Sequence, residues 1–269
     1  MSIATYDQGI IHYEEQGKGE PLILIHGVGL DHTMWEKQVK RLSGTFRVIC
    51  YDMIGHGGSE HPPGPYSLAQ FVDQLLALMN YLQIKKCHLV GFSMGGMVAQ
   101  SFALKHQEKL KSLTIMSAVA NRTDEQTKAI LSRVEEVKQY GPLGTIEPAI
   151  KRWFTPEFLK TEKEIVAKIK NRLQTNNPKS YLDSYTLFAT ADQELWPILH
   201  RIDVPTLIIT GQHDVGSNSL MAKQMHEQIK NSELVIVDNM KHMLPVEDAE
   251  TVNDVIQKFI KRQQVISAK

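Results

Sequence analysis

Short apolar runs alternate with longer amphipathic stretches through the first 120 residues of the chain. Each run is rich in branched side chains and is followed by glycine or polar residues, which is typical of strands buried on both faces. Buried strands that alternate with helices form parallel sheets covered by helices on both sides. The predicted strands are Pro21–His26, Phe46–Tyr51, Cys87–Val90 and Leu113–Met116, preceded by a hairpin through Ile10–Glu15.

A helix is well marked between the second and third of these runs. Ser67 and Gln70 have the spacing of a capping box, in which each side chain bonds to the other residue's backbone N–H. The apolar residues that follow recur every three or four positions, which gathers them on one helix face. These residues are Leu68, Phe71, Val72, Leu75, Leu76, Met79 and Leu82.

The alternation stops near Ala120 and resumes near residue 202. Between these points the patterns are mostly helical. Helix starts are predicted at Thr123, where Gln126 completes a second capping box, and at Thr155, which precedes a proline. After the helical stretch, strands are predicted at Pro205–Thr210 and Glu233–Val237, and a final helix from Pro245.

We therefore expect one core with an insert. Residues 1–120 and 202–269 are predicted to form an α/β core, a doubly wound and mostly parallel sheet. Residues 121–201 are predicted to form a helical cap. Ligands bind at the carboxyl ends of the strands in open α/β sheets, so a cap over those ends would enclose a ligand site.

Composition narrows the classes of function. Apolar residues make up 42 % and charged residues 22 % of the chain, as in globular proteins with a sizeable core. Thirty basic residues balance thirty acidic ones, so net charge gives no reason to expect nucleic acid or anionic lipid as partner.

The expected location follows from three further features. No run approaches the ~18 apolar residues of a membrane span, and the first residues lack the pattern of a secretory signal. Both cysteines, Cys50 and Cys87, lie in buried-strand patterns, as in a reduced protein. We expect a cytoplasmic protein without a membrane association, and the sequence leaves open whether it forms a homo-oligomer.

The sharpest local motif is Gly91-Phe-Ser-Met-Gly95, which lies between a buried strand and a helical pattern. A serine hydroxyl is a weak nucleophile and must be held out of the packed surface beside a base. A tight strand-to-helix turn achieves this through a strained backbone at its central residue, with glycine two positions to either side. Ser93 is thus the predicted nucleophile.

Such a serine needs a base and an acid that orients the base. His242 follows the last predicted strand and Asp214 follows the strand before it, so both are expected at the same sheet edge as Ser93. Asp238 and Asp248 are the rival acids, although Asp248 falls in the first turn of a helix, where a carboxylate complements the helix dipole. Seven other histidines, in hairpin, loop, helix-surface or buried-strand patterns, fit the role less well.

Hydrolysis of an ester also needs donors for the oxyanion of the tetrahedral intermediate. Backbone N–H groups suit this role because they are already fixed in place. The predicted donors are Met94, which begins a helix directly after the nucleophile, and Val28, in the loop His26-Gly-Val-Gly29. An ordinary glycine-rich turn is the alternative interpretation of that loop.

Five ordered motifs together resemble the α/β-hydrolase fold superfamily. The resemblance runs from about Ile11 to Ile260, and the order Ser93, Asp214, His242 is that of the family's triad. It implies a helical cap over the site. The motifs are His26–Gly29, Asp52–Ser59, which the resemblance implies to be a structural loop, Gly91–Gly95, the Asp214 loop and His242.

A narrower resemblance concerns the insert. Arg152-Trp-Phe-Thr155, together with Trp35 after the oxyanion loop, is similar to 3-oxoadipate enol-lactonases and related small-ester hydrolases. The candidate substrate-binding residues are Trp35, Arg152, Trp153, Tyr185 and Phe188. For the cap aromatics, plain packing of cap against core is the alternative, and for Arg152 a solvated surface position.

Absent motifs narrow the chemistry. Haloalkane dehalogenases and epoxide hydrolases of this fold carry Asp where this chain has Ser93, and no phosphate loop, dinucleotide turn or metal-ligand spacing occurs. We predict no cofactor and no metal. The leading hypothesis is a serine hydrolase that cleaves a small carboxylic ester or lactone through an acyl-enzyme. The alternatives are a C–C bond hydrolase or perhydrolase with the same triad, and a ligand-sensing regulatory protein on a hydrolase scaffold.

Overall fold

An eight-stranded sheet forms the centre of the computed structural model, which describes residues 2–267. The strands are β1 (Ser2–Tyr6), β2 (Gly9–Gln16), β3 (Glu20–Ile25), β4 (Phe46–Tyr51), β5 (Cys87–Phe92), β6 (Leu110–Met116), β7 (Thr206–Gly211) and β8 (Ser232–Val237). They lie in the order β1-β2-β4-β3-β5-β6-β7-β8. The pairs β1–β2 and β2–β4 are antiparallel and all others are parallel, which confirms the predicted α/β fold with a mostly parallel sheet.

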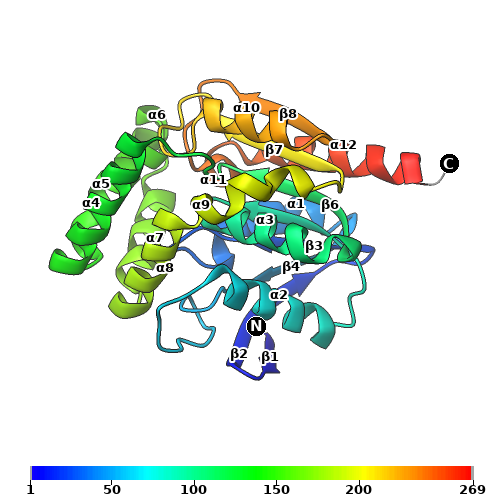
Figure 1. Ribbon diagram of the computed structural model, residues 1–269, viewed down its shortest axis with the longest axis horizontal. Helices are drawn as coiled ribbons and strands as arrows, with labels where there is room; N and C mark the ends of the chain where they lie inside the picture. The colour runs from blue at the N-terminus through cyan, green and yellow to red at the C-terminus, as the bar shows by residue number, and fades with distance from the viewer. Residues whose placement is uncertain (1, 268–269) are drawn as a thin grey trace.

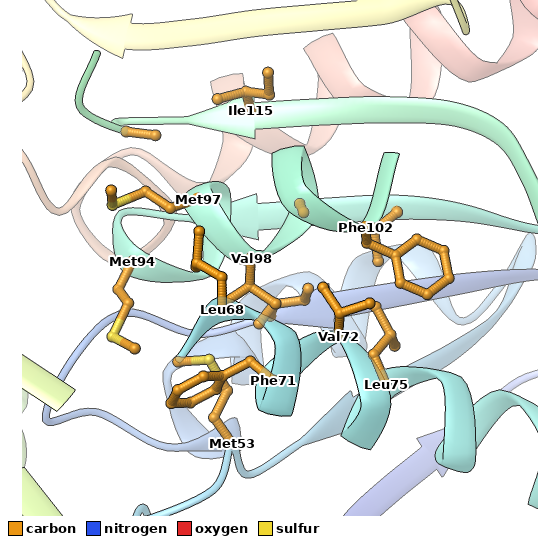
Figure 2. Close-up of a cluster of buried hydrophobic side chains, with 14 of the residues drawn as sticks. Met53, Leu68, Phe71, Val72, Leu75, Met94, Met97, Val98, Phe102 and Ile115 are labelled. Carbon is orange, nitrogen blue, oxygen red and sulfur yellow. The ribbon is translucent and has the colours of Figure 1, made fainter. Parts of the chain in front are cut away.

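Helices cover both faces of the sheet (Figure 1). On one face lie α2 (Leu68–Tyr81), α3 (Met94–His106) and α10 (Ser219–Gln228); on the other lie α1 (Glu36–Leu42), α11 (Leu244–Glu247) and α12 (Ala249–Ser267). Figure 2 shows the first face, where Phe71 and Val72 of α2 lie near Val98 and Phe102 of α3. All four side chains are fully buried, so apolar burial holds both helices in place.

The capping boxes locate two helix starts. The Ser67 and Gln70 side chains each bond to the other's backbone N–H at the start of α2. Thr123 and Gln126 do the same at the start of α4 (Asp124–Tyr140). Both starts agree with the sequence prediction.

A group of helices lies between β6 and β7, where the cap is expected. They are α4, α5 (Leu143–Trp153), α6 (Pro156–Thr161), α7 (Lys163–Gln174), α8 (Pro178–Thr190) and the short α9 (Asp192–Leu195), followed by the 3-10 segment η3 (Trp196–Arg201). Thr155 caps α6 through a hydrogen bond from the backbone N–H of Phe158, as the Thr-Pro pattern predicts. In Figure 1, α4 to α8 lie together beside one end of the sheet. The inserted helices α4 to α9 are called the cap below.

Two details differ from the sequence prediction. The residues predicted as a hairpin, Ile10–Glu15, lie in the single strand β2, which forms a hairpin with β1, a strand that the sequence does not predict. The final helix does not run on from Pro245, because the chain turns at Asp248 (φ −126°, ψ 60°) and α12 begins at Ala249. Among the described residues, none of the helices combines the length and apolar character that a bilayer crossing requires.

Both cysteines lie inside the sheet. Cys50 on β4 and Cys87 on β5 are free thiols and are fully buried. Burial raises the pKa of Cys87 to about 12 and raises that of Cys50 as well. The thiols are therefore part of the core, as the buried-strand patterns indicate.

Candidate active site

Ser93 lies at a sharp turn between β5 and α3. Its backbone has φ 55° and ψ −117°, a strained conformation for a residue with a side chain. A Cβ atom at Gly91 would come within 2.2 Å of the Gly95 carbonyl oxygen, and one at Gly95 within 2.4 Å of the His26 carbonyl oxygen. Both positions therefore require glycine, and the turn holds the Ser93 side chain at the end of β5.

The structure brings Ser93, His242 and Asp214 into one hydrogen-bonded chain. Ser93 Oγ lies 3.2 Å from His242 Nε2, and His242 Nδ1 lies 2.6 Å from Asp214 Oδ2. The second carboxylate oxygen accepts the backbone N–H groups of Gly216 (2.9 Å) and Ser217 (3.0 Å). Because an ionised carboxylate only accepts, His242 Nδ1 carries the proton and Nε2 is left to accept the serine proton. The arrangement can therefore activate the hydroxyl.

The rival acids lie elsewhere. Asp238 is exposed after β8. Asp248 Oδ1 accepts the backbone N–H of Thr251 (3.3 Å) at the start of α12, the helix-start position that the sequence predicts. Asp214, in contrast, is almost fully buried beside His242.

Two aromatic rings flank the His242 imidazole. The Phe92 ring centroid lies 4.9 Å from the imidazole centroid, and the Trp153 centroid lies 6.0 Å from it. Trp153 belongs to α5, so a cap side chain contacts the imidazole directly. The Trp153 carbonyl also accepts the backbone N–H of Met243, the next residue after His242 (3.1 Å). The cap thus helps to fix the loop that carries His242.

The loop after β3 approaches Ser93 closely. A Cβ atom at Gly27 would lie 3.0 Å from the Phe92 ring and 3.3 Å from Ser93 Cβ. Within residues 2–267, the backbone N–H groups of Val28 and Met94 donate to no other group. Both residues are nearly fully buried. They are thus available as donors to an oxyanion formed beside Ser93, the role for which the sequence suggests them.

His26 anchors the start of this loop. Its Nδ1 donates to the Gly27 carbonyl (2.8 Å), and its Nε2 accepts the backbone N–H of Met53 (2.9 Å). Full burial lowers the pKa of His26, which keeps the imidazole neutral, as one donating and one accepting nitrogen require. The sequence marks His26 only as part of the motif; its role is to hold the loop.

A cavity of about 390 Å³ opens beside Ser93 and His242 and is enclosed mainly by the cap. Four of the five predicted substrate-binding residues line it: Arg152, Trp153, Tyr185 and Phe188. The fifth, Trp35, does not. Its side chain is fully buried and packs edge-on against Phe92, with the ring centroids 6.4 Å apart, so it belongs to the core.

The sequence alone does not single out several of the residues that line the cavity. Among the polar and aromatic residues they include Tyr181, Arg122, Arg133 and Glu136. Tyr181 carries a signal that was available, since it precedes Tyr185 by four positions and shares its face of α8. The two rings stack with centroids 5.7 Å apart. The charged residues of α4 carry no comparable signal in the sequence.

The cavity contains three arginines in two different states. Arg122 is almost fully buried, pairs with Asp192 (2.5 Å) and donates to the Phe188 carbonyl (3.2 Å), so it serves the packing of the cap. Arg133 and Arg152 form no ion pair with a carboxylate among residues 2–267. Burial and the charge of Arg133 lower the pKa of Arg152, although Glu136 acts in the opposite direction. Glu136 and Asp214 also line the cavity, so the two arginines are balanced in charge but neither guanidinium is held by a carboxylate of the described residues.

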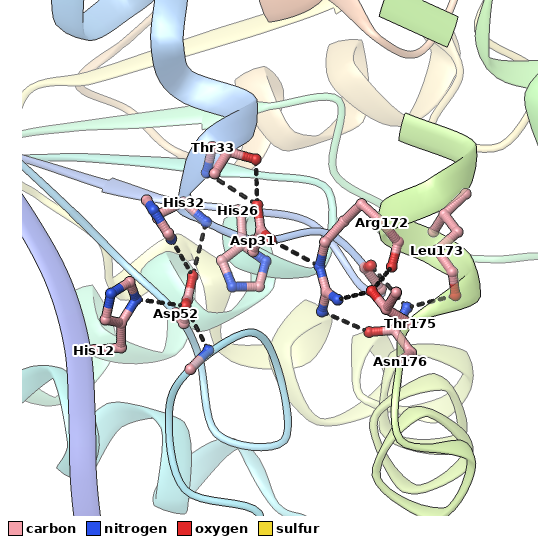
Figure 3. A network of polar contacts seen from close by, with 12 residues as sticks. His12, His26, Asp31, His32, Thr33, Asp52, Arg172, Leu173, Thr175 and Asn176 are labelled. Atoms are coloured by element: carbon pink, nitrogen blue, oxygen red, sulfur yellow. Dashed lines mark hydrogen bonds and ion pairs between the residues drawn. The ribbon is translucent and has the colours of Figure 1, made fainter. Parts of the chain in front are cut away.

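Among the described residues, His12, His32 and Asp52 have ligand atoms close enough for a metal ion, within 4.8 Å of one another. The Asp52 carboxylate, however, accepts four hydrogen bonds at 2.8 Å: from both imidazole Nδ1 atoms and from the backbone N–H groups of His32 and Gly58 (Figure 3). Burial alone would raise the pKa of Asp52, but the hydrogen bond from His32 and nearby imidazoles hold it below its usual value. This cluster anchors the loop after β4.

The sheet order, the strained serine turn and the inserted cap define a class of enzyme. The chain belongs to the alpha/beta hydrolase fold family, whose model matches residues 20–249. This confirms the resemblance found in the sequence, and the protein is a hydrolase.

Particular relatives are consistent with this class. Two come from Acinetobacter baylyi (strain ATCC 33305 / BD413 / ADP1). (E)-2-((N-methylformamido)methylene)succinate hydrolase is 32 % identical, with 93 % of each chain covered. 3-Oxoadipate enol-lactonase 2 is 31 % identical over 90 % of this chain and 88 % of the relative. Among solved structures, the enol-lactonase from Burkholderia xenovorans LB400 superposes with a TM-score of 0.91 at 26 % identity, covering 97 % of this chain and 100 % of that one.

Proposed function

We propose that this hydrolase cleaves a small carboxylic ester or lactone that carries a carboxylate group, through an acyl-enzyme on Ser93. The observation that carries the proposal is the hydrogen-bonded chain from Ser93 Oγ through His242 to Asp214, open to the cavity at its serine end. This is the arrangement that makes a serine nucleophilic.

In the first half-reaction, Ser93 Oγ attacks the substrate carbonyl while His242 Nε2 takes its proton. The Val28 and Met94 N–H groups hold the oxyanion of the tetrahedral intermediate. The C–O bond to the leaving group then breaks, and His242 returns the proton to the departing alcohol oxygen. Asp214 keeps the imidazole in the required tautomer and stabilises its protonated form.

In the second half-reaction, a water molecule attacks the acyl-enzyme and gives its proton to His242. Collapse of the second tetrahedral intermediate releases the carboxylic acid, and Ser93 regains its proton. With a lactone, the leaving hydroxyl stays attached to the acyl chain, so a single hydroxy acid is released.

Two guanidinium groups in the cavity support a substrate with its own carboxylate. Arg152 and Arg133 line the cavity beside Glu136, and neither forms an ion pair with a carboxylate among the described residues. A guanidinium can bind a carboxylate in a bidentate manner, through two parallel N–H···O hydrogen bonds. The names of two relatives refer to a succinate derivative and to a 3-oxoadipate lactone. The cavity volume of about 390 Å³ suits a small molecule, near the lower end of the ~300–1,000 Å³ common for ligand pockets.

A substrate panel with one variant tests the reaction class. Wild type and Ser93→Ala are assayed on p-nitrophenyl acetate, an enol-lactone and a meta-cleavage diketone, and the acyl-enzyme is trapped for mass spectrometry. We expect turnover of the ester or lactone, an acyl adduct on Ser93, and a loss of at least ~10⁴-fold in the variant. Ser101→Ala, on the same helix but outside the cavity, is the control.

Two outcomes would contradict the proposal. Retained ester turnover by Ser93→Ala would remove Ser93 from its role. Cleavage of the diketone with negligible ester or lactone turnover would assign the same triad to C–C bond hydrolysis.

A further inference from the structure

The cap holds the oxyanion loop by a hydrogen bond to its backbone. Asn176 lies between α7 and α8 and is only 6 % exposed. Its Nδ2 donates to the Gly29 carbonyl (2.8 Å) and to the Leu173 carbonyl (3.1 Å), while its Oδ1 accepts from Arg172 Nη2 (2.8 Å). Figure 3 shows this link between the end of α7 and the loop. Both N–H groups and the oxygen of the amide are thus engaged, which fixes its orientation.

Arg172 adds a second link two residues further along the same loop. Its Nε lies 2.8 Å from Asp31 Oδ2, in an ion pair that is largely buried on both sides. Nη1 of the same guanidinium donates to Thr175 Oγ1 (2.8 Å). Arg172 therefore fixes both the Asn176 amide and the far end of the loop.

The backbone at Gly29 is packed closely against the cap. Gly29 has φ 76°, and a Cβ atom there would lie 2.8 Å from the Tyr181 ring and 3.0 Å from the Leu173 side chain. The backbone of the loop therefore lies directly against α7 and α8. A side chain at Gly29 would separate the cap from the core.

The geometry of the loop connects this contact to Val28. The Leu30 N–H donates to the Gly27 carbonyl (3.2 Å), which closes a tight turn with Val28 as its second residue. His26 Nδ1 holds the near end of that turn, at Gly27. The cap holds its far end, at Gly29. A rotation of the turn would move the Val28 N–H. The contacts at Gly27 and Gly29 together therefore fix the direction in which this N–H points.

We propose that Asn176 and Arg172 are positioning residues for the oxyanion donor at Val28, so that the cap completes the transition-state site in addition to shaping the pocket. The inference rests on the proposed function. It predicts a specific kinetic signature: loosening the link weakens stabilisation of the tetrahedral intermediate and leaves ground-state binding nearly unchanged.

The test compares Asn176→Asp with Asn171→Asp. The first substitution is isosteric and removes both donated hydrogen bonds; the second makes the same chemical change at an exposed position of α7. The readouts are kcat and KM on an ester that wild type hydrolyses, Ki for a trifluoromethyl ketone whose adduct forms an oxyanion, and Tm. Removal of one oxyanion donor costs about 10²–10³-fold, and a misplaced donor costs part of that. We expect kcat to fall about 10- to 100-fold and Ki to rise in parallel, with KM within about 2-fold.

Arg172→Lys is the second variant. It keeps the positive charge near Asp31 but loses the donors to Thr175 and Asn176. We expect a smaller fall in kcat with the same parallel rise in Ki. If Asn176→Asp does not fold, this variant decides the question.

The inference is overturned if Asn176→Asp behaves like Asn171→Asp, or if kcat falls with a loss of Tm while Ki for the ketone is unchanged. These outcomes leave the proposed function intact, since wild type still hydrolyses the ester. Failure of the proposed function shows itself separately, as full activity of Ser93→Ala.

Discussion

At the scale of single residues, the site depends on backbone that only glycine permits. Ser93 adopts its strained conformation because Gly91 and Gly95 let two chain segments pass at distances that no Cβ allows. At Gly95 the obstructing atoms are the carbonyl oxygens of Ile25 and His26, which belong to the backbone and cannot swing away. The strain at the serine is thus maintained by close packing around it.

Gly95→Ala tests this dependence. The new Cβ would lie 2.4 Å from the His26 oxygen and 2.5 Å from the Ile25 oxygen. Overpacking typically costs about 1–3 kcal/mol, and we expect about 3 kcal/mol or more here because backbone must move. Gly44→Ala, where nothing lies within 4 Å, is the control and should stay within about 0.5 kcal/mol. Urea unfolding measures both; similar values for the two variants would refute the packing argument.

Arg152 offers a test of substrate charge at the same scale. Mono-p-nitrophenyl succinate and p-nitrophenyl butyrate have a similar shape, and only the first carries a carboxylate. A hydrogen bond to a charged group contributes about 1.5–3 kcal/mol, so Arg152→Gln should raise KM for the succinate ester about 10- to 100-fold. The butyrate ester should change less than about 2-fold. Equal effects on both esters would show that Arg152 does not bind a substrate carboxylate.

At the scale of elements, the cap is joined to the Val28 loop and to α11, the helix that follows His242. The segment around Asn176 contacts the loop of Val28, as described above. On the other side, Thr155 at the start of α6 donates its backbone N–H and its hydroxyl to the Glu247 carboxylate of α11. Burial raises the pKa of Glu247, although these hydrogen bonds act against the shift. Cap and core thus meet through specific polar contacts at the Val28 loop and at α11.

Thr155→Val should weaken the contact between Thr155 of the cap and Glu247 of α11. The isosteric change removes the hydroxyl that donates to Glu247 and accepts the Phe158 N–H as the cap of α6. We expect a loss of about 1–2 kcal/mol in unfolding free energy, the usual range for a lost helix cap and hydrogen bond. Thr161→Val, at the exposed end of the same helix, should change stability by less than about 0.5 kcal/mol. Equal losses of unfolding free energy in the two variants would argue against a stabilising contact between Thr155 and Glu247.

Elements were predictable where local chemistry determines them. The capping boxes at Ser67 and Thr123 fix helix starts through contacts three residues apart, and the apolar runs mark strands buried on both faces. The break at Asp248 was not predictable, since Pro245 favours a helix start and no glycine or proline marks the turn at Asp248. Trp35 was wrongly expected at the substrate because a motif gives proximity in sequence but not the direction of a side chain.

The whole molecule depends on contacts between residues far apart in the chain. The positions of Ser93, Asp214 and His242 could be predicted together because each follows a strand, and parallel strands end at one edge. The bonds Asn176–Gly29 and Arg122–Asp192 join residues 147 and 70 positions apart and leave no local pattern. Only the folded chain shows them, because no local pattern in the sequence links the cap to the Val28 loop.

His32 gives the whole molecule a pH-dependent contribution to stability. Burial lowers the pKa of His32, but its hydrogen bond and charge attraction to Asp52 outweigh burial and raise it above 6.5. A raised folded-state pKa means that the contribution is complete below the unfolded value, about 6.5, and is lost as pH rises through the folded value. His32→Gln should therefore destabilise the protein more at pH 6 than at pH 9. The same substitution at exposed His226 is the control, and a pH-independent loss for His32→Gln would contradict the assignment.

The buried cysteines have a practical consequence. Cys50 and Cys87 are sealed within the sheet, and a thiol with a pKa of about 12 is almost entirely protonated at neutral pH. Alkylating reagents such as iodoacetamide attack the thiolate, so they should leave the native enzyme unmodified, and purification should not require a reductant. Labelling of either cysteine would instead report that the sheet has opened, which makes the pair a built-in sensor of global unfolding.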